Sequence, residues 1–167
     1  RFLKRLVLII LPLVLLIIGI AVFMARKKAQ SPLPDYNVDV KLKGLDETVE
    51  VIYDSVGIPH IFAHNEWDLY MVTGYILAQE RMWQMDLLRR VTLGRLSEIF
   101  GDDYIETDLL LRSLEYSKKS EAMLGNLPNV PYQALKAFTS GVNQYIDDKK
   151  GNYPIEFYVL QYEPEYW

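Results

Sequence analysis

The sequence has no cysteine and only two histidines among its 167 residues. Without cysteine, the chain can form neither a disulfide framework nor a cysteine-ligated metal site. The histidines, His60 and His64, have no carboxylate at a spacing that suits zinc, and no His-Glu-x-x-His pattern is present. We expect His60 to be a hydrogen-bonded structural residue and His64 to lie on the surface, and we assign no residue to a metal.

Nucleophile and phosphate-binding motifs are also missing. No serine stands in a Gly-x-Ser-x-Gly pattern, and no glycine-rich loop could cradle a phosphate. The acidic pairs at 102–103 and 147–148 lack the odd-position ladder of a calcium loop. The motifs therefore predict no catalytic, cofactor-binding or metal-binding residue in this sequence.

Charge is absent between residues 6 and 25. Twenty residues rising about 1.5 Å each span roughly the 30 Å hydrocarbon core of a bilayer, where only a helix satisfies its own backbone. Arg1, Lys4 and Arg5 precede the run, and Arg-Lys-Lys at 26–28 follows it. A buried core helix of this length would show a polar face, so the pattern predicts a membrane anchor with basic flanks over residues 1–28.

A cleaved signal peptide is the alternative to an anchor. Its apolar region is usually about 7–15 residues long and ends at a small-x-small site. This run is longer, and the Arg-Lys-Lys at its end makes a poor cleavage site. Three basic residues on each side leave the positive-inside rule undecided. With the anchor at the N-terminal end, we expect a short cytoplasmic tail and an exported domain.

Acidic residues are absent from the first 28 positions but abundant later. The remaining sequence carries 12 basic and 22 acidic residues, a formal charge of −10. Nucleic acid binding needs a basic patch for the phosphates, so this balance argues against a nucleic acid partner.

Periodicity and turn residues predict an α+β organisation after the anchor. Residues 29–48 are interpreted as a proline-stiffened linker followed by a first strand at 38–42. Strands at 49–54 and 58–63 are expected to form a hairpin, with Pro59 on an edge strand or at the start of a strand. The rest is expected to be helical: 66–93 with Asn65 and Asp68 at its start and Gly94 after its end, a turn or two at 95–100, 108–124 capped by Thr107, and 131–149 beginning with Pro131, before an aromatic tail at 153–167.

The helix predicted over 66–93 is apolar on two sides, which is typical of a helix buried in a large protein. Arg81 shares a face with Leu77, Ala78, Met85 and Leu88, where its guanidinium would be largely desolvated and would need a carboxylate. An internal ion pair with Asp86, Glu98 or Asp108 is therefore favoured over a role near substrate.

Several short motifs occur in one order along residues 49–167. They are Tyr53-Asp54-x-x-Gly57-Ile58-Pro59-His60-Ile61, Ala78-Gln79-Glu80-Arg81-Met82-Trp83-Gln84-Met85-Asp86, Gly94-Arg95-Leu96-Ser97-Glu98, Glu156-Phe157 and Pro164-Glu165-Tyr166-Trp167. In this order the sequence resembles the N-terminal part of the penicillin acylase family of N-terminal-nucleophile hydrolases. The resemblance implies a framework role, not a catalytic one, for Gly57, Pro59, His60, Gln79, Arg81, Gln84, Asp86, Gly94 and Glu98.

The resemblance implies an αββα sandwich in which residues 49–167 are a mostly helical α-chain segment with a β-hairpin, completed by residues outside this sequence. Family members are made as one precursor, and self-cleavage exposes a catalytic serine at the start of a β chain. That serine would lie beyond Trp167. The expected partners are the downstream β chain, the lipid bilayer and a small-molecule amide substrate. No cofactor is expected from these residues, although the resemblance allows calcium in the full-length protein.

The leading expectation is the N-terminal segment of a membrane-anchored amidohydrolase. Its substrate would be a linear amide, as in the acyl side chain of a β-lactam or an acyl-homoserine lactone, cleaved through an acyl-enzyme. This segment alone is expected to be inactive. One alternative is a non-catalytic anchored binding or assembly module of the same fold, and another is a free-standing helical membrane protein. The desolvated Arg81 and the aromatic tail argue against the last, because both require partners outside the sequence.

Overall fold

The computed structural model describes the backbone of residues 2–167 and the side chains from Ile10 onward. Arg1 and the side chains of Lys4 and Arg5 lie outside the described residues, so their expected place in a basic flank is not described. The chain separates into two compact units, which divide between Leu33 and Pro34.

The first unit consists mainly of α1 (Phe2–Gln30), a helix that continues through Pro12. Its stretch Ile10–Gln30 is long and apolar enough to cross a membrane. A signal sequence near the N-terminus can also be long and apolar enough to meet this criterion. The helix therefore fits an anchor or a signal sequence.

The second unit contains the expected β-hairpin, formed by β1 (Glu50–Tyr53) and β2 (Pro59–Phe62) in antiparallel register. Asp54 shapes the turn, because its carboxylate accepts hydrogen bonds from the amides of Val56 and Ile58, both at 2.9 Å. Gly57 has a φ of 81°, which the residue closing such a turn requires and glycine adopts at little cost. Pro59 begins its strand as predicted.

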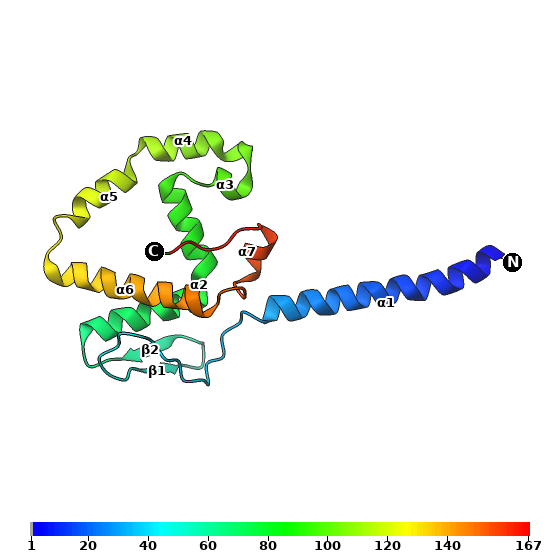
Figure 1. Ribbon diagram of the computed structural model, residues 1–167, viewed down its shortest axis with the longest axis horizontal. Helices are drawn as coiled ribbons and strands as arrows, with labels where there is room; N and C mark the ends of the chain where they lie inside the picture. The colour runs from blue at the N-terminus through cyan, green and yellow to red at the C-terminus, as the bar shows by residue number, and fades with distance from the viewer. Residues whose placement is uncertain (1) are drawn as a thin grey trace. The chain divides into compact units, whose positions relative to one another are not determined.

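The strand predicted at 38–42 is absent, although the segment lies beside the hairpin (Figure 1). Val38 and Val40 are exposed, and no strand pairs with this segment. The next residue, Lys43, instead exchanges main-chain hydrogen bonds with the Gln144 side chain, at 2.6 and 3.0 Å. Alternating residues form a strand only where a neighbouring strand takes up their backbone hydrogen bonds, so the pattern alone was insufficient.

Helix α2 (Glu66–Leu93) has the predicted bounds. The Asn65 side chain caps its start by accepting the amide of Asp68 at 2.8 Å, and Gly94 ends it in the left-handed conformation. The helix is distorted at Arg81, where φ is −138° and ψ is 21°.

The helical region after α2 is more divided than predicted. The helix expected over 108–124 starts earlier, at Ile105, and breaks at Glu115, whose φ of 55° cannot continue a right-handed helix. Thr107 therefore lies inside a helix and caps nothing. The elements are α3 (Ser97–Phe100), η1 (Asp102–Tyr104), α4 (Ile105–Ser113), α5 (Tyr116–Leu124), α6 (Asn129–Asp148, starting two residues before Pro131) and α7 (Ile155–Val159).

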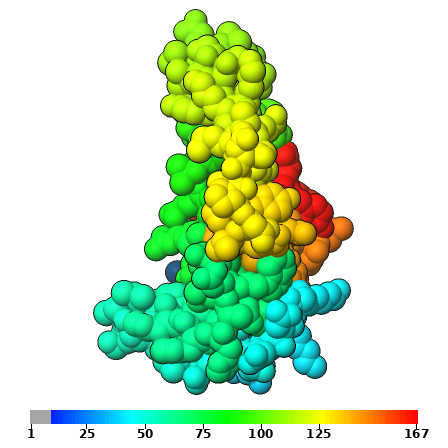
Figure 2. All heavy atoms as spheres, turned by 90° about the vertical axis from the view of Figure 1, so that its left-hand side faces the viewer, coloured from blue at the N-terminus to red at the C-terminus, as the bar shows by residue number. Residues whose placement is uncertain are grey.

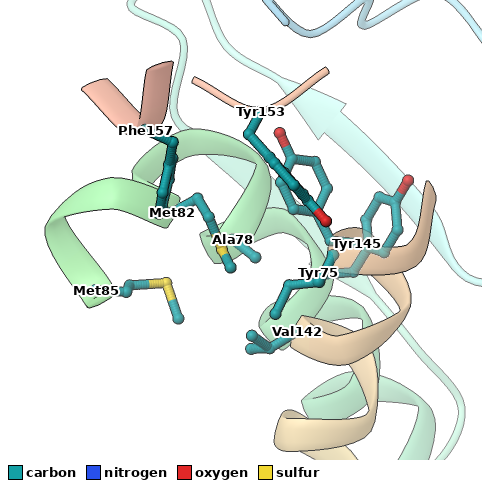
Figure 3. Packing of buried hydrophobic residues seen from close by; sticks show 9 residues of the cluster. Tyr75, Ala78, Met82, Met85, Val142, Tyr145, Tyr153 and Phe157 are labelled. Atoms are coloured by element: carbon teal, nitrogen blue, oxygen red, sulfur yellow. The ribbon is translucent and has the colours of Figure 1, made fainter. Parts of the chain in front are cut away.

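The core of the second unit lies where α2 and α6 cross. A Cβ added to Gly74 would lie 2.1 Å from the Phe138 carbonyl oxygen, and one added to Gly141 would lie 1.9 Å from the Met71 carbonyl oxygen. The two helix backbones are therefore in direct contact. Around this contact the buried side chains interlock (Figure 3): Tyr75, Ala78, Met82 and Met85 of α2, and Val142, Tyr145 and Ile146 of α6.

Part of the aromatic tail packs within the chain, whereas Tyr158, Val159 and Tyr166 are exposed. Tyr153 and Phe157 are only 5% and 2% exposed and complete the core (Figure 3). By contrast, α5 buries no residue, and Leu109 and Leu110 of α4 are exposed. The segment that contains α4 and α5, coloured yellow-green in Figure 2, extends away from the hairpin region.

Candidate functional site

Three buried carboxylates along and beyond α2 organise the framework, and the first is Asp68. It accepts hydrogen bonds from the amides of Asp46 and Glu47, both at 2.9 Å, and from the Asn65 side chain at 2.7 Å. Burial raises the pKa of Asp68, but these hydrogen bonds outweigh it and the net pKa lies below its usual value. Asp68 thus fixes the loop before the hairpin to the start of α2, rather than closing a conventional capping box.

The second carboxylate, Asp86, is fully buried and pairs with two arginines. Arg89 and Arg90 each place a guanidinium nitrogen 2.9 Å from one of its oxygens. Burial lowers the pKa of Arg90, but the hydrogen bond and charge of Asp86 more than compensate and keep it above its usual value. Removing one partner of such a buried ion pair strongly destabilises the folded protein, because the other charge stays buried without compensation.

Glu98 and Glu165 extend this pair into a network. Arg90 donates to Glu98 at 2.8 Å and lies 3.5 Å from Glu165, while Arg95 donates to both carboxylates, at 2.8 and 2.7 Å. Hydrogen bonding to Arg95 is the main cause that lowers the pKa of Glu165 to about 2, and it also lowers the pKa of Glu98. The network therefore joins α2, the Gly94–Glu98 turn and the last residues of the chain.

Further contacts hold residues 162–167 in place. The guanidinium of Arg90 lies 4.7 Å from the centre of the Tyr162 ring, and that of Arg89 lies 4.8 Å from the Trp167 ring. Asn143 of α6 accepts the Trp167 amide at 2.8 Å and donates to its carbonyl at 3.1 Å. Residues 162–167, which we call the C-terminal strap, are thus fastened to α2 and α6.

The third carboxylate, Asp108 of α4, positions the turn that follows α2. It accepts the amides of Leu96 and Ser97, both at 2.8 Å, and the Ser97 hydroxyl at 2.6 Å. Burial raises the pKa of Asp108, but these donors and nearby Arg112 bring it below its usual value. Arg112 also donates to the Gly94 carbonyl at 2.8 Å, so α4 is fixed to the end of α2.

A groove of about 750 Å³ is lined by residues of the 35–53 segment and by Val72, Tyr75, Ile76 and Gln79 of α2. Gln79 and Tyr53, which both line the groove, meet with 3.5 Å between the Gln79 amide nitrogen and the Tyr53 hydroxyl. Burial, the charge of Glu80 and the neighbouring Tyr36 raise the pKa of Tyr53 to about 12, so its hydroxyl stays protonated at neutral pH. The lining side chains include Asp35, Tyr36, Val38, Asp39, Val40, Leu42, Leu45, Val49, Glu50, Val51, Tyr53, Val72, Tyr75, Ile76 and Gln79.

The structure corrects the prediction for Arg81. Its side chain is exposed and makes one long hydrogen bond, 3.4 Å, to Gln84. The buried arginine that pairs with Asp86 and Glu98 is Arg90, which sequence reasoning missed. The spacing of four residues between Asp86 and Arg90 was the available signal, since such pairs meet on one helix face.

The other predicted framework residues occupy separate places. His60 is 3.6 Å from Asp54 at the hairpin turn and more than half exposed, and His64 is exposed. Gln79 lines the groove, Asp86 and Glu98 belong to the ion-pair network, and Gly94 ends α2.

The residues present do not fit a metal. Within the part of the chain that the structure describes, no three histidine, aspartate or glutamate side chains converge as a metal site requires. The described residues therefore offer no such donor set for the calcium that the resemblance allows in the full-length protein.

Comparison with known proteins places this framework in a family. The family model described as penicillin amidase matches residues 48–167. The chain is 37% identical over 142 residues to penicillin acylase 2 proenzyme of Pseudomonas sp. strain SE83, covering 85% of this chain and 18% of that protein. It is 31% identical over 139 residues to acyl-homoserine lactone acylase QuiP of Pseudomonas fluorescens strain Pf-5, covering 83% and 17%.

A solved structure shares the fold. The thermostable penicillin G acylase of Alcaligenes faecalis aligns with a TM-score of 0.66 and 28% identity, over 72% of this chain and 65% of that chain. The chain spans less than a fifth of the length of the curated relatives named above. Because the family model covers residues 48–167, which include the hairpin, the ion-pair network and the C-terminal strap, the chain belongs to the penicillin amidase family.

Proposed function

We propose that this chain is the N-terminal, framework-forming part of an amidohydrolase that cleaves a linear amide. The observation that carries the proposal is the family match over 48–167, together with relatives named as penicillin acylases and acyl-homoserine lactone acylases. Both names describe removal of an acyl group, and the two substrates share an amide between that group and a ring. We propose this acyl amide as the substrate class.

The chemistry would be supplied by a serine beyond Trp167, at the start of a second chain released by self-cleavage. Its hydroxyl would attack the amide carbonyl with its own α-amine as base, and aimed donors would stabilise the oxyanion. Hydrolysis of the acyl-enzyme would complete the cycle. The name proenzyme carried by one relative supports a processed precursor.

The role proposed for residues 34–167 is to build and hold the framework on which the second chain completes an αββα sandwich. Asp68, Asp86 and Asp108 are all engaged in internal hydrogen bonds or ion pairs. None of these carboxylates is therefore free to take part in acyl transfer. This segment alone would therefore be inactive. Residues 1–28 would anchor the protein in the membrane, with the hydrolase domain exported.

N-terminal sequencing of every polypeptide in the full-length protein, purified from membranes, tests this proposal. We expect a larger second polypeptide beginning with serine, and hydrolysis of a chromogenic acyl amide that is lost when this serine is replaced by alanine. A single unprocessed polypeptide without amidase activity would refute the proposal and favour a non-catalytic module of the same fold.

The same preparation tests the anchor. If residues 1–28 are an uncleaved anchor, the first polypeptide keeps its N-terminal sequence and stays in the membrane pellet after alkaline carbonate extraction. A polypeptide that begins after Lys28 and is released by carbonate would instead identify a cleaved signal peptide.

A further inference from the structure

One side of α2 presents two leucines and an arginine to the outside. Leu77, Arg81, Gln84 and Leu88 follow one another at spacings of three or four residues, and all four are exposed. The leucines are 41% and 66% exposed, in a helix whose other sides bury eleven residues. We call these four residues the α2 stripe. Arginine among apolar side chains is typical of protein interfaces.

Arg81 is bonded differently from the other arginines of the second unit. Each of those four arginines donates to a carboxylate or a main-chain carbonyl at 2.9 Å or less. Among the described residues, Arg81 makes a single hydrogen bond, 3.4 Å long, to the neutral Gln84 side chain. The carboxylate of the adjacent Glu80 instead accepts the Tyr36 hydroxyl, at 3.3 Å. Most of the five N–H donors of the Arg81 guanidinium therefore face outward.

The chemistry of a guanidinium narrows what it can bind in an interface. Its planar fork matches a carboxylate in two parallel hydrogen bonds, and it is less strongly hydrated than an ammonium group. An ion pair flanked by Leu77 and Leu88 would be shielded from solvent and from salt. The stripe therefore suits a protein segment that carries one acidic side chain among apolar ones.

We propose that the polypeptide beyond Trp167 docks on the α2 stripe, with an aspartate or glutamate paired to Arg81 and apolar side chains covering Leu77 and Leu88. This inference rests on the proposed function, because it requires the longer polypeptide. The matched relatives are more than five times as long as the stretch that this chain covers. A segment of the same protein is also present at a high effective concentration, which favours it over a second copy.

The proposal explains why the sequence predicts a desolvated Arg81 while this chain leaves it exposed. In the full-length protein the guanidinium is buried by the docked segment, and its carboxylate comes from that segment instead of from Asp86, Glu98 or Asp108. A buried charge needs such a partner.

A zero-length crosslink in the full-length protein identifies the carboxylate. Arg81→Lys keeps the positive charge and supplies a primary amine, which a carbodiimide joins to a touching carboxylate as an amide, with loss of water. We expect peptide mass spectrometry to show this amide between position 81 and an acidic residue beyond Trp167. Coupling of Lys118 to Glu115, 3.4 Å apart in the same helical region, is the internal positive control. If that control couples while position 81 couples only within residues 34–167 or not at all, the proposal is wrong.

Removing the charge tests how much the pair contributes. Within this chain alone, Arg81→Met should change the unfolding equilibrium only about 2-fold, because exposed side chains contribute little. In the full-length protein the variant leaves a buried carboxylate unpaired, so the α2 amides should exchange at least about 100-fold faster.

Lys136→Met is the matched control, because it removes an exposed cation from α6. We expect its α2 amides to exchange at the wild-type rate. If Arg81→Met also exchanged at that rate, no buried carboxylate would depend on Arg81, and the proposal would be overturned.

Two readouts separate this inference from other outcomes. In a mixture of isotopically heavy and light protein, crosslinks between heavy and light peptides would assign the partner to a second copy and overturn the proposal. An active, self-processed enzyme without the expected crosslink would overturn this inference and leave the proposed function standing. The expected crosslink in a protein that neither self-processes nor hydrolyses amides would support docking and refute the proposed function.

Discussion

Replacing Gly141 with alanine tests the α2–α6 contact on which the framework depends. The added Cβ would lie 1.9 Å from the Met71 carbonyl oxygen and 2.8 Å from the Tyr75 amide nitrogen. Both are backbone atoms that cannot rotate away. An ordinary contact needs at least 3.4 Å, so the two helices must separate locally by roughly 1.5 Å.

The cost of this separation follows from the side chains that surround the crossing. Tyr75, Ala78, Val142 and Tyr145 are nearly or fully buried there. Burial of side chains of this size is worth about 2 kcal/mol each, and a gap of 0.5–1 Å forfeits about a quarter to a half of the contact energy. We therefore expect Gly141→Ala to destabilise the crossing by about 2–4 kcal/mol, after which the better helix propensity of alanine restores up to about 1 kcal/mol.

Hydrogen exchange of the α6 amides in the full-length protein measures the loss of stability at the crossing directly, because the free energy of local opening determines the exchange rate. A net loss of about 1–4 kcal/mol corresponds to roughly 5-fold to 900-fold faster exchange. Gly125→Ala is the matched control, since its Cβ would meet nothing closer than 3.8 Å and its φ is −64°. If Gly141→Ala exchanged as slowly as Gly125→Ala, the close backbone contact would be wrong.

Three further predictions concern the carboxylates. Arg90→Met leaves the fully buried Asp86 with one of its two arginines, and should speed exchange of the α2 amides by an amount equivalent to about 3 kcal/mol. Asp108→Asn replaces one accepting oxygen by a donor facing the Ser97 amide and hydroxyl, and should cost about 1–3 kcal/mol, seen as lost protection of the Ser97 amide. The pKa of Glu165, about 2 when folded, lies below its unfolded value of about 4.3. The stabilisation of the folded state by the ionised Glu165 carboxylate is therefore fully present above about pH 4.3 and is lost as the pH falls toward 2. We expect Glu165→Gln to make the melting temperature less dependent on pH over that interval.

Each of these predictions has an outcome that would contradict it. Arg95→Met should perturb the α2 amides less than Arg90→Met, because the Arg95 side chain is 27% exposed and that of Arg90 only 5%. A reversed order would show that the buried pair is not the main fastening of the network. An unchanged Ser97 amide in Asp108→Asn, or an unchanged acid limb in Glu165→Gln, would contradict the hydrogen bonds assigned to those carboxylates.

Signals that act over a few residues were sufficient to predict several elements. The Asn65 cap and the left-handed Gly94 mark the two ends of α2, and each signal involves only residues within about one helical turn of that end. Gly57 and Pro59 mark the turn and the second strand of the hairpin. The break at Glu115 was not predictable, because nothing in its local pattern separates it from the helices on either side.

The candidate site was predicted only in part. An internal ion pair of Arg81 with Asp86, Glu98 or Asp108 was expected, whereas the arginine that pairs with Asp86 and Glu98 is Arg90. Helical periodicity identifies apolar stripes without showing which of them meets a partner, and α2 carries apolar residues on more than one side. The buried stripe runs through Met82 and Met85, which leaves Arg81 on the exposed flank.

The sequence by itself determined the apolar helix at the N-terminus, the hairpin, the bounds of α2 and the resemblance to the penicillin acylase family, because each depends on residues close together or on motifs in order. Only the tertiary structure decided that Arg90 is the buried partner of Asp86, that Glu165 closes the network across 70 to 75 residues, and that the 38–42 segment remains unpaired. The physical reason is that desolvation and strand pairing depend on neighbours supplied by distant segments, and the pattern of one segment does not specify them.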